Sequence, residues 1–284
     1  MVDMKGWSRN RVGLYVNDAL ADFHYDPKAL ASPRNQHKMY KQKLIATHLI
    51  GFGGGISVAG VGAPASYACD GAGDSLSVPD SSDWPSGTNA FTLEMWLRFN
   101  TVAHGNDIMN HWAGGGQNSF VWFWNVWGTD MTFLASSDGS SSSNVFTETW
   151  SPSADTWYHV AVSRSGNTWR VFVDGTQLGS DTTDSRSLHD STAILDICGT
   201  EAEAPLDGYL DEVRVSDNAR YTSGFSVQTE DFASDVNTGL LIHSNEAIVT
   251  GTTGSGATFV DSGNTGHTVT EIGDAVRDES ELPY

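Results

Sequence analysis

The chain has 284 residues, 39% of them hydrophobic, with 30 Gly and 10 Trp, a globular composition that can form one sizeable core. Its net charge of −20 argues against nucleic acid as a partner, because proteins bind that polyanion through Lys and Arg. The charge is uneven: residues 1–43 carry eight basic residues against four Asp, a net of +4, whereas the other 241 residues carry a net of −24. This asymmetry marks the N-terminal segment as a separate unit.

Residues 1–43 read as a basic anchoring arm on an acidic body. Asp26-Pro27 and Ser32-Pro33 each place a capping side chain before a proline, so we expect short helices to start there, in an arm that is partly helical or extended. An arm this short cannot bury its own apolar side chains, so the body or a neighbouring subunit must cover them. We therefore expect the arm to dock onto an acidic partner. That partner is either another protein or a second copy of this chain, which would make a homo-oligomer.

Residues 44–66 read as a Gly/Ala-rich linker. The stretch from Leu44 to Ala68 has no charged residue, but its six glycines and Pro64 make it a poor membrane-spanning helix, so we expect no membrane insertion. The alternative is a secretory signal cleaved near Ala65, although its charged region would be over forty residues long. The linker is the preferred interpretation.

Two strands stand out in the region that we assign to a sandwich, residues 67–236. Phe91 to Phe99 alternates, so that one face is apolar and the other carries a Trp between Glu94 and Arg98. The stretch FVWFWNVW, residues 120–127, has aromatic rings on both faces. Such a strand is either buried on both sides or presents rings on an open face.

Residues 155–180, DTWYHVAVSRSGNTWRVFVDGTQLGS, predict a hairpin followed by a third strand. Period-two alternation lies on both sides of the Gly166-Asn167 turn, as two half-buried paired strands require. A second tight turn is predicted at Asp174-Gly175.

Three stretches in order resemble one family. Residues 157–180 resemble the central hairpin of the laminin-G-like, concanavalin-A-like jelly-roll lectin modules, Tyr67 to Phe99 resembles their opening strands, and Leu206 to Phe225 resembles their closing strand. The resemblance implies an all-β fold, a concanavalin-A-like jelly-roll β-sandwich. The family is functionally broad, so function has to come from a site.

Modules of this family often bind sugars, because flat aromatic rings stack on pyranose faces while polar groups take the hydroxyls. The resemblance therefore implies a candidate glycan-binding platform around the aromatic strand, made of Asn110, His111, Trp122, Trp124 and Asn125. The alternative is that these rings belong to the core or to a subunit interface.

Glucanases that share this fold cleave with paired carboxylates in a pattern like E-x-D-x-x-E, because the two groups must flank one glycosidic bond. That spacing does not occur here, and Asp211 and Glu212 are expected on opposite faces of a strand. We therefore predict that the protein is not an enzyme.

The resemblance also implies a structural calcium ion near the closing strand, with Asp211 matching an acidic position there. If the C-terminal segment returns to that strand, Asp261 is the second calcium ligand beside Asp211. The alternative is that these aspartates only stabilise turns, as Asp residues in loops usually do. Cys69 and Cys198 do not make a disulfide framework, and two buried free thiols are the preferred interpretation, with pairing as the alternative.

The C-terminal segment, residues 237–284, resembles the opening unit of such a module although it comes last. It either completes its own sandwich, as in a circular permutation, or donates a strand to a neighbouring subunit.

Residues 217–244 and 259–270 are similar to modules of marine bacteriophage virion proteins. This resemblance implies a virion structural protein, a capsid decoration or a tail or fibre component on the virion surface, with residues 1–43 docking onto capsid or tail proteins and the jelly roll meeting a host-surface glycan. The alternatives are a secreted, extracellular lectin module and a degenerate glycoside hydrolase.

Overall fold

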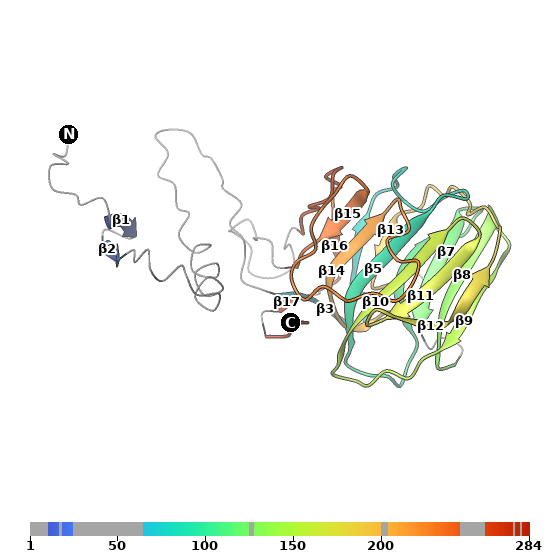
Figure 1. Cartoon of the computed structure of the whole chain (residues 1–284), viewed down its shortest axis with the longest axis horizontal. Helices are drawn as coiled ribbons and strands as arrows, with labels where there is room; N and C mark the ends of the chain where they lie inside the picture. The colour runs from blue at the N-terminus through green and yellow to red at the C-terminus, as the bar shows by residue number, and fades with distance from the viewer. Residues whose placement is uncertain are drawn as a thin grey trace. The chain divides into compact units, whose positions relative to one another are not determined.

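The computed structural model describes residues 65–124, 128–199, 204–244, 259–274, 276–278 and 280–284, and the backbone of residues 11–16 and 19–24 (Figure 1). The chain divides into two compact units, Met1–Val61 and Gly62–Tyr284. In the first unit, β1 (Arg11–Val16) and β2 (Ala19–His24) form an antiparallel hairpin. The helices expected after Asp26-Pro27 and Ser32-Pro33 lie outside the described residues. No helix with the length and apolar character of a membrane span occurs in the described parts of the chain.

The second unit is built from strands alone within the described residues. In chain order they are β3 (Ser66–Asp70), β4 (Ser75–Val78), β5 (Phe91–Phe99), β6 (Asn106–Trp112), β7 (Asn118–Trp124), β8 (Asp130–Gly139), β9 (Ser142–Thr149), β10 (Trp157–Ser165), β11 (Thr168–Val173), β12 (Thr176–Thr183), β13 (Leu195–Ile197), β14 (Asp207–Ser216), β15 (Thr238–Ile242), β16 (Thr270–Ile272) and β17 (Val276–Asp278).

These strands form two antiparallel sheets that pack face to face (Figure 1). The eight-stranded sheet has the order β12-β11-β10-β5-β14-β3-β17, and β15 also pairs with β14. The seven-stranded sheet has the order β16-β4-β13-β6-β7-β8-β9. The all-β jelly-roll sandwich expected from the sequence is confirmed.

The predicted hairpin forms with the predicted turns. Strands β10 and β11 pair from Val160 opposite Val173 to Ser165 opposite Thr168. Asp174 and Gly175 then join β11 to β12 with φ angles of 49° and 72°. Two successive positive φ angles match the right-handed twist of a hairpin, which explains an Asp-Gly pair at this place.

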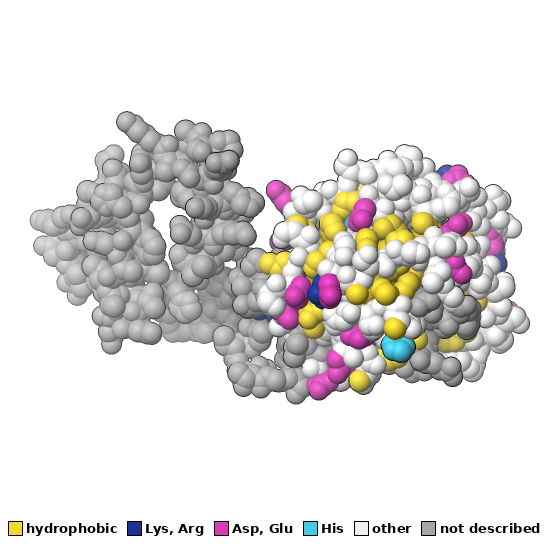
Figure 2. Space-filling view, turned by 90° about the horizontal axis from the view of Figure 1, so that it is seen from below, with side chains coloured by type: hydrophobic (Ala, Val, Ile, Leu, Met, Phe, Trp, Pro, Cys, Tyr) yellow, Lys and Arg dark blue, Asp and Glu magenta, His cyan; other side chains and the backbone are white. Residues whose placement is uncertain are grey.

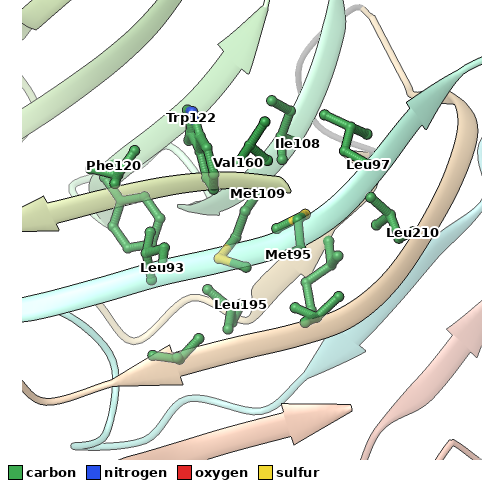
Figure 3. Packing of buried hydrophobic residues seen from close by; sticks show 14 of the residues in the cluster. Leu93, Met95, Leu97, Ile108, Met109, Phe120, Trp122, Val160, Leu195 and Leu210 are labelled. Carbon is green, nitrogen blue, oxygen red and sulfur yellow. The ribbon is translucent and has the colours of Figure 1, made fainter. Parts of the chain in front are cut away.

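The core lies between the sheets. Strand β5 contributes Leu93, Met95 and Leu97, which point toward Met109 and Trp122 of the opposite sheet, and all five side chains are fully buried (Figure 3). Alternation on β5 sends every second side chain into this core, so the remaining ones must lie on the outer face of the eight-stranded sheet.

The C-terminal segment packs in its own chain. Strand β15 pairs with β14, β16 pairs with β4 and β17 pairs with β3, so both sheets gain strands from it. In the single chain, residues 237–284 thus add strands to both sheets, as the first of the two accounts predicts, and donation to a neighbouring subunit stays a prediction.

Cys69 and Cys198 form a disulfide between β3 and the end of β13, across 129 residues of sequence. The expectation of two free thiols is wrong. Both residues are buried in the core where the two sheets meet, and this packing, not their sequence spacing, brings the sulfur atoms together.

Candidate functional site

The outer face of the eight-stranded sheet carries rows of side chains set by strand register. Arg98 on β5 lies between Trp157 of β10 and Tyr209 of β14. Two residues along the strands, Trp96 lies between His159 and Asp211. The next row places Glu94 beside Arg214, because a β-bulge at Glu212, with a φ of 53°, shifts β14 by one residue.

The Glu94 row is a buried charge network. Glu94 is 0% exposed, and its Oε1 accepts a hydrogen bond of 2.8 Å from Arg214 Nε. Its Oε2 accepts 2.7 Å from the Tyr221 hydroxyl and lies 3.1 Å from His159 Nε2. Burial by itself would raise the pKa of Glu94, but the hydrogen bond with His159 and the charge of Arg214 lower it, so the carboxylate is ionised.

This network ties residues 217–236 over the sheet. Tyr221 reaches Glu94 from that segment, and the backbone N–H of Arg220 donates 2.8 Å to Thr92 Oγ1. The Arg220 guanidinium pairs with Asp235 at 2.7 Å. The Glu94 half of the outer face is therefore closed, and its role is structural.

The other end of the face is more open. The Trp157 and Tyr209 rings are half-buried, with centroids 6.3 Å apart, and they lean toward each other across Arg98. The Arg98 guanidinium lies over the Tyr209 ring, 4.9 Å from its centroid. The two partly exposed rings have an interplanar angle of 55° and flank the arginine, so apolar rings and a guanidinium lie side by side here. We call Trp157, Arg98 and Tyr209 the aromatic row.

Polar groups frame the aromatic row. Arg98 donates to Asn100 Oδ1 at 2.9 Å and to Asp155 Oδ1 at 2.7 Å. Asn100 in turn donates 2.9 Å to Asp207 Oδ1. Viewed from below, the Gly62–Tyr284 unit shows apolar side chains gathered in the middle of one face with acidic side chains around them (Figure 2).

Two indole groups of this region lack hydrogen-bond partners. Trp96 is 7% exposed, and neither its Nε1 nor that of Trp157 has a partner among the described residues. Buried polar atoms in folded proteins are nearly always paired. Both N–H groups are therefore buried donors that make no hydrogen bond within the described residues.

The platform expected around the aromatic strand is not formed by its rings. Trp122 and Trp124 are 0% and 2% exposed and belong to the core, as Figure 3 shows for Trp122. Trp124 donates its indole N–H to the Trp150 carbonyl at 3.1 Å. A ring enclosed between two sheets cannot stack on a sugar, so the alternative, core aromatics, describes these two residues.

The remaining predicted platform residues do not join the two tryptophans. Asn110 is on the outer face of the seven-stranded sheet, where it donates 3.3 Å to Asp107 Oδ2. His111 is buried against Phe120, its Nε2 lies 3.0 Å from the Ala193 carbonyl, and burial lowers its pKa. Asn125 lies outside the described residues.

The predicted calcium pair, Asp211 and Asp261, is occupied by backbone donors. Asp211 Oδ1 accepts from the N–H groups of Glu212 at 2.9 Å and Ser244 at 3.2 Å. Asp261 Oδ1 accepts from Leu241 at 2.9 Å and from Gly263 at 2.7 Å. Among the described residues the two carboxylates have no hydrogen-bond donor in common, and each of them fixes a turn or a bulge.

A different acidic group has ligand-like spacing. Carboxylate oxygens of Asp70, Asp74 and Asp274 lie within 4.8 Å of one another. Both oxygens of Asp74 already accept backbone N–H groups, from Asp70 at 3.0 Å and from Asp274 at 2.8 Å. These hydrogen bonds connect the turn between β3 and β4 to the residues that follow β16, which accounts for the cluster without a metal ion.

Sequence reasoning missed the aromatic row. The alternation of residues 157–162 puts Trp157 and His159 on one face, and the alternation of residues 91–99 puts Trp96 and Arg98 on one face. Only the pairing of β10 and β14 with β5 brings these faces together, with Tyr209 beside Arg98.

Comparison with known proteins agrees with the fold. The profile of the concanavalin A-like lectin/glucanases superfamily matches residues 70–223, more than half of the chain. No curated protein sequence matches this chain.

Solved structures with a similar fold share little sequence with the chain. A Bacteroides ovatus ATCC 8483 protein provisionally described as carbohydrate binding is 15% identical, with a TM-score of 0.53 over 79% of this chain, and the chain spans 62% of that protein's length. The pentraxin of Limulus polyphemus is 15% identical over 55% of this chain and 81% of its own, with a TM-score of 0.36. Domain 4 of a Geobacillus stearothermophilus arabinanase is 15% identical over 54% and 71%, with a TM-score of 0.43.

Proposed function

Because the chain belongs to the concanavalin A-like lectin/glucanases superfamily, we propose that it is a non-enzymatic surface protein whose sandwich binds carbohydrate at the aromatic row. The observation that carries the proposal is the pair of half-buried rings, Trp157 and Tyr209, on either side of Arg98. Rings stack on the apolar face of a sugar, while the guanidinium and nearby carboxylates bind hydroxyls.

The charges around the row favour a neutral sugar. Asp155 and Asp207 lie on one side of Arg98, and Glu281 lies 3.6 Å from its Nε on another. An anionic sugar would meet these carboxylates and lose the Coulomb energy gained from one arginine that is already paired.

The buried carboxylates next to the row support binding without hydrolysis. Glycoside cleavage needs one carboxylic acid and one carboxylate, both facing the same bond. Glu94 is fully buried, with its oxygens held by Arg214, Tyr221 and His159. A carboxylate fixed in this way neither attacks a sugar nor exchanges protons with it.

The experiment is a glycan array of neutral and acidic oligosaccharides, followed by calorimetry on variants. Trp157→Ala and Tyr209→Ala should each weaken binding of a neutral oligosaccharide by about tenfold, since an aromatic contact contributes on the order of 1 kcal/mol beyond its buried area. Trp112→Ala, which removes a half-buried ring from the other sheet, is the matched control. If Trp157→Ala and Tyr209→Ala bound the oligosaccharide as tightly as Trp112→Ala does, the assignment of the site would be refuted.

We further propose that the protein is displayed on a virion, where residues 1–43 bind an acidic surface of the capsid or tail. The support is the net of +4 on that arm against −24 on the rest of the chain, together with the resemblance to phage virion modules. The disulfide fits a location outside a reducing cytosol. Mass spectrometry of purified particles should find the chain at a fixed copy number. A chain found free in the medium and cut near Ala65 would instead support the secreted lectin.

A further inference from the structure

A second group of polar side chains lies on the outer face of the seven-stranded sheet. Asp107 and Asn110 are three residues apart on β6 and would normally point to opposite faces. A β-bulge between Asp107 and Met109 inserts one residue and turns them to the same face. Asp196 of β13 is paired directly with Asn110, so the three side chains are neighbours.

All three side chains are enclosed. Asp107 and Asp196 are 0% exposed and Asn110 is 1% exposed. Asn110 Nδ2 donates to Asp107 Oδ2, but Asp107 Oδ1 and Asn110 Oδ1 have no partner among the described residues. Two acceptor oxygens buried without a donor are costly, so each of them calls for a partner such as a water molecule or an ion.

The chain closes tightly around Asp107. Gly199, with a φ of 66°, approaches so closely that a Cβ there would overlap the Asp107 side chain. The Asp107 N–H donates 2.8 Å to the Ala204 carbonyl, and the N–H of Cys198 donates 3.1 Å to Ile108. The disulfide links Cys198, the residue before Gly199, to Cys69 of β3.

The side chains at this site favour a cation. Within the described residues Asp107 forms no ion pair with a basic side chain, and its one hydrogen-bond donor is an amide. Two carboxylates and an amide oxygen, without nitrogen or sulfur, are the donor set of a hard cation.

We propose that Asp107, Asn110 and Asp196 bind a calcium ion that joins β6 to β13. Calcium suits the site because it accepts irregular coordination by carboxylate and amide oxygens, whereas zinc prefers nitrogen and sulfur. These ligands differ from Asp211 and Asp261, and they lie on the other sheet from the aromatic row.

The experiment uses the full chain after treatment with a chelator, titrated with calcium chloride by calorimetry and followed by thermal unfolding. We expect one tight site whose occupation raises the melting temperature. Asp107→Asn should weaken that site by about tenfold or more, since metal sites lose this much even when only supporting groups change. The control is Asp70→Asn combined with Asp274→Asn, two exposed positions of the other acidic cluster, which should leave the tight site intact.

If Asp107→Asn does not fold, a second variant and a crystallographic location of the bound ion still test the proposal. Asn110→Leu removes one ligand oxygen at similar size and should also weaken calcium. Crystals of the wild-type chain soaked with terbium chloride should give an anomalous peak beside Asp107 and Asp196. Absence of calcium binding by the wild type, loss of binding only in the Asp70/Asp274 variant, or an anomalous peak elsewhere would overturn the proposal.

These tests are independent of the proposed function, since they use the metal alone without a sugar. If the cation site fails while Trp157→Ala abolishes sugar binding, the aromatic row stands by itself.

Discussion

Replacing Glu94 with Gln should be strongly destabilising. The wild-type carboxylate is fully buried, receives hydrogen bonds from Arg214 and Tyr221, and lies within hydrogen-bond distance of His159. The substitution leaves the Arg214 charge uncompensated inside the protein and turns an amide NH₂ toward one of the donors. Breaking a buried ion pair in this way costs about 3–5 kcal/mol. That is a large part of a typical stability of roughly 5–15 kcal/mol.

The assay is urea unfolding followed by tryptophan fluorescence, with Asp181→Asn as the control. Asp181 pairs with Arg170 at 2.6 Å, a shorter contact than that between Glu94 and His159, but the aspartate is exposed. An exposed pair is screened by water, so this control should leave the unfolding midpoint unchanged. If Glu94→Gln were as stable as Asp181→Asn, the network would not hold residues 217–236 on the sheet.

Three further predictions concern stability. Burial and the neighbouring Glu212 raise the pKa of Asp211 from 3.8 to about 7, so the stability from its bound proton is fully present below pH 3.8 and is lost as pH rises through 7. Asp211→Asn keeps the acceptor oxygen without a titrating proton. It should therefore be more stable than the wild type near pH 8, by up to roughly 4 kcal/mol, and equal to it near pH 4. Urea unfolding at both pH values measures this difference, and a wild type that is the more stable protein at pH 8 would contradict the prediction. Replacing Cys69 and Cys198 with Ser should cost about 4–5 kcal/mol, the chain-entropy value for a loop of this length, and an unchanged melting temperature would count against the bond. Trp122→Ala should cost about 3–5 kcal/mol, measured by urea unfolding, without weakening sugar binding per folded molecule, and a selective loss of binding would return this ring to the ligand site.

The strands of the central hairpin were predictable because their signals are local. Period-two alternation and a Gly-containing turn act over a few residues, and Asp174-Gly175 takes the positive φ angles that its residue types allow. The apolar face of β5 was predictable for the same reason.

The face of the aromatic strand was not predictable. Alternation shows that Trp122 and Trp124 share a face, but both faces of FVWFWNVW are aromatic, so the pattern does not indicate which one meets the core. Packing against β5 and β8 decides it, because the rings of Phe99 and Phe133 lie against that face.

The candidate site depended on register between distant strands. Trp157, Arg98 and Tyr209 come from three separate segments, and a shift of one residue in either pairing would send a ring to the other face. The disulfide likewise depended on the meeting of β3 with the end of β13, which two isolated cysteines in a sequence do not reveal.

The most direct test of the central claim is the set of tryptophan indole N–H signals in an NMR titration with the oligosaccharide that the array selects. Trp157 belongs to the aromatic row and Trp96 lies in the next row of the same face, and neither indole N–H has a partner among the described residues. Trp122 and Trp124 are instead in the core, where their indole N–H groups donate to Met131 and to the Trp150 carbonyl. Substitution of each ring with Phe assigns its signal. We predict shifts for Trp96 and Trp157, with Trp122 and Trp124 unchanged. Shifts confined to Trp122 and Trp124, or no shift in any indole signal, would contradict the account.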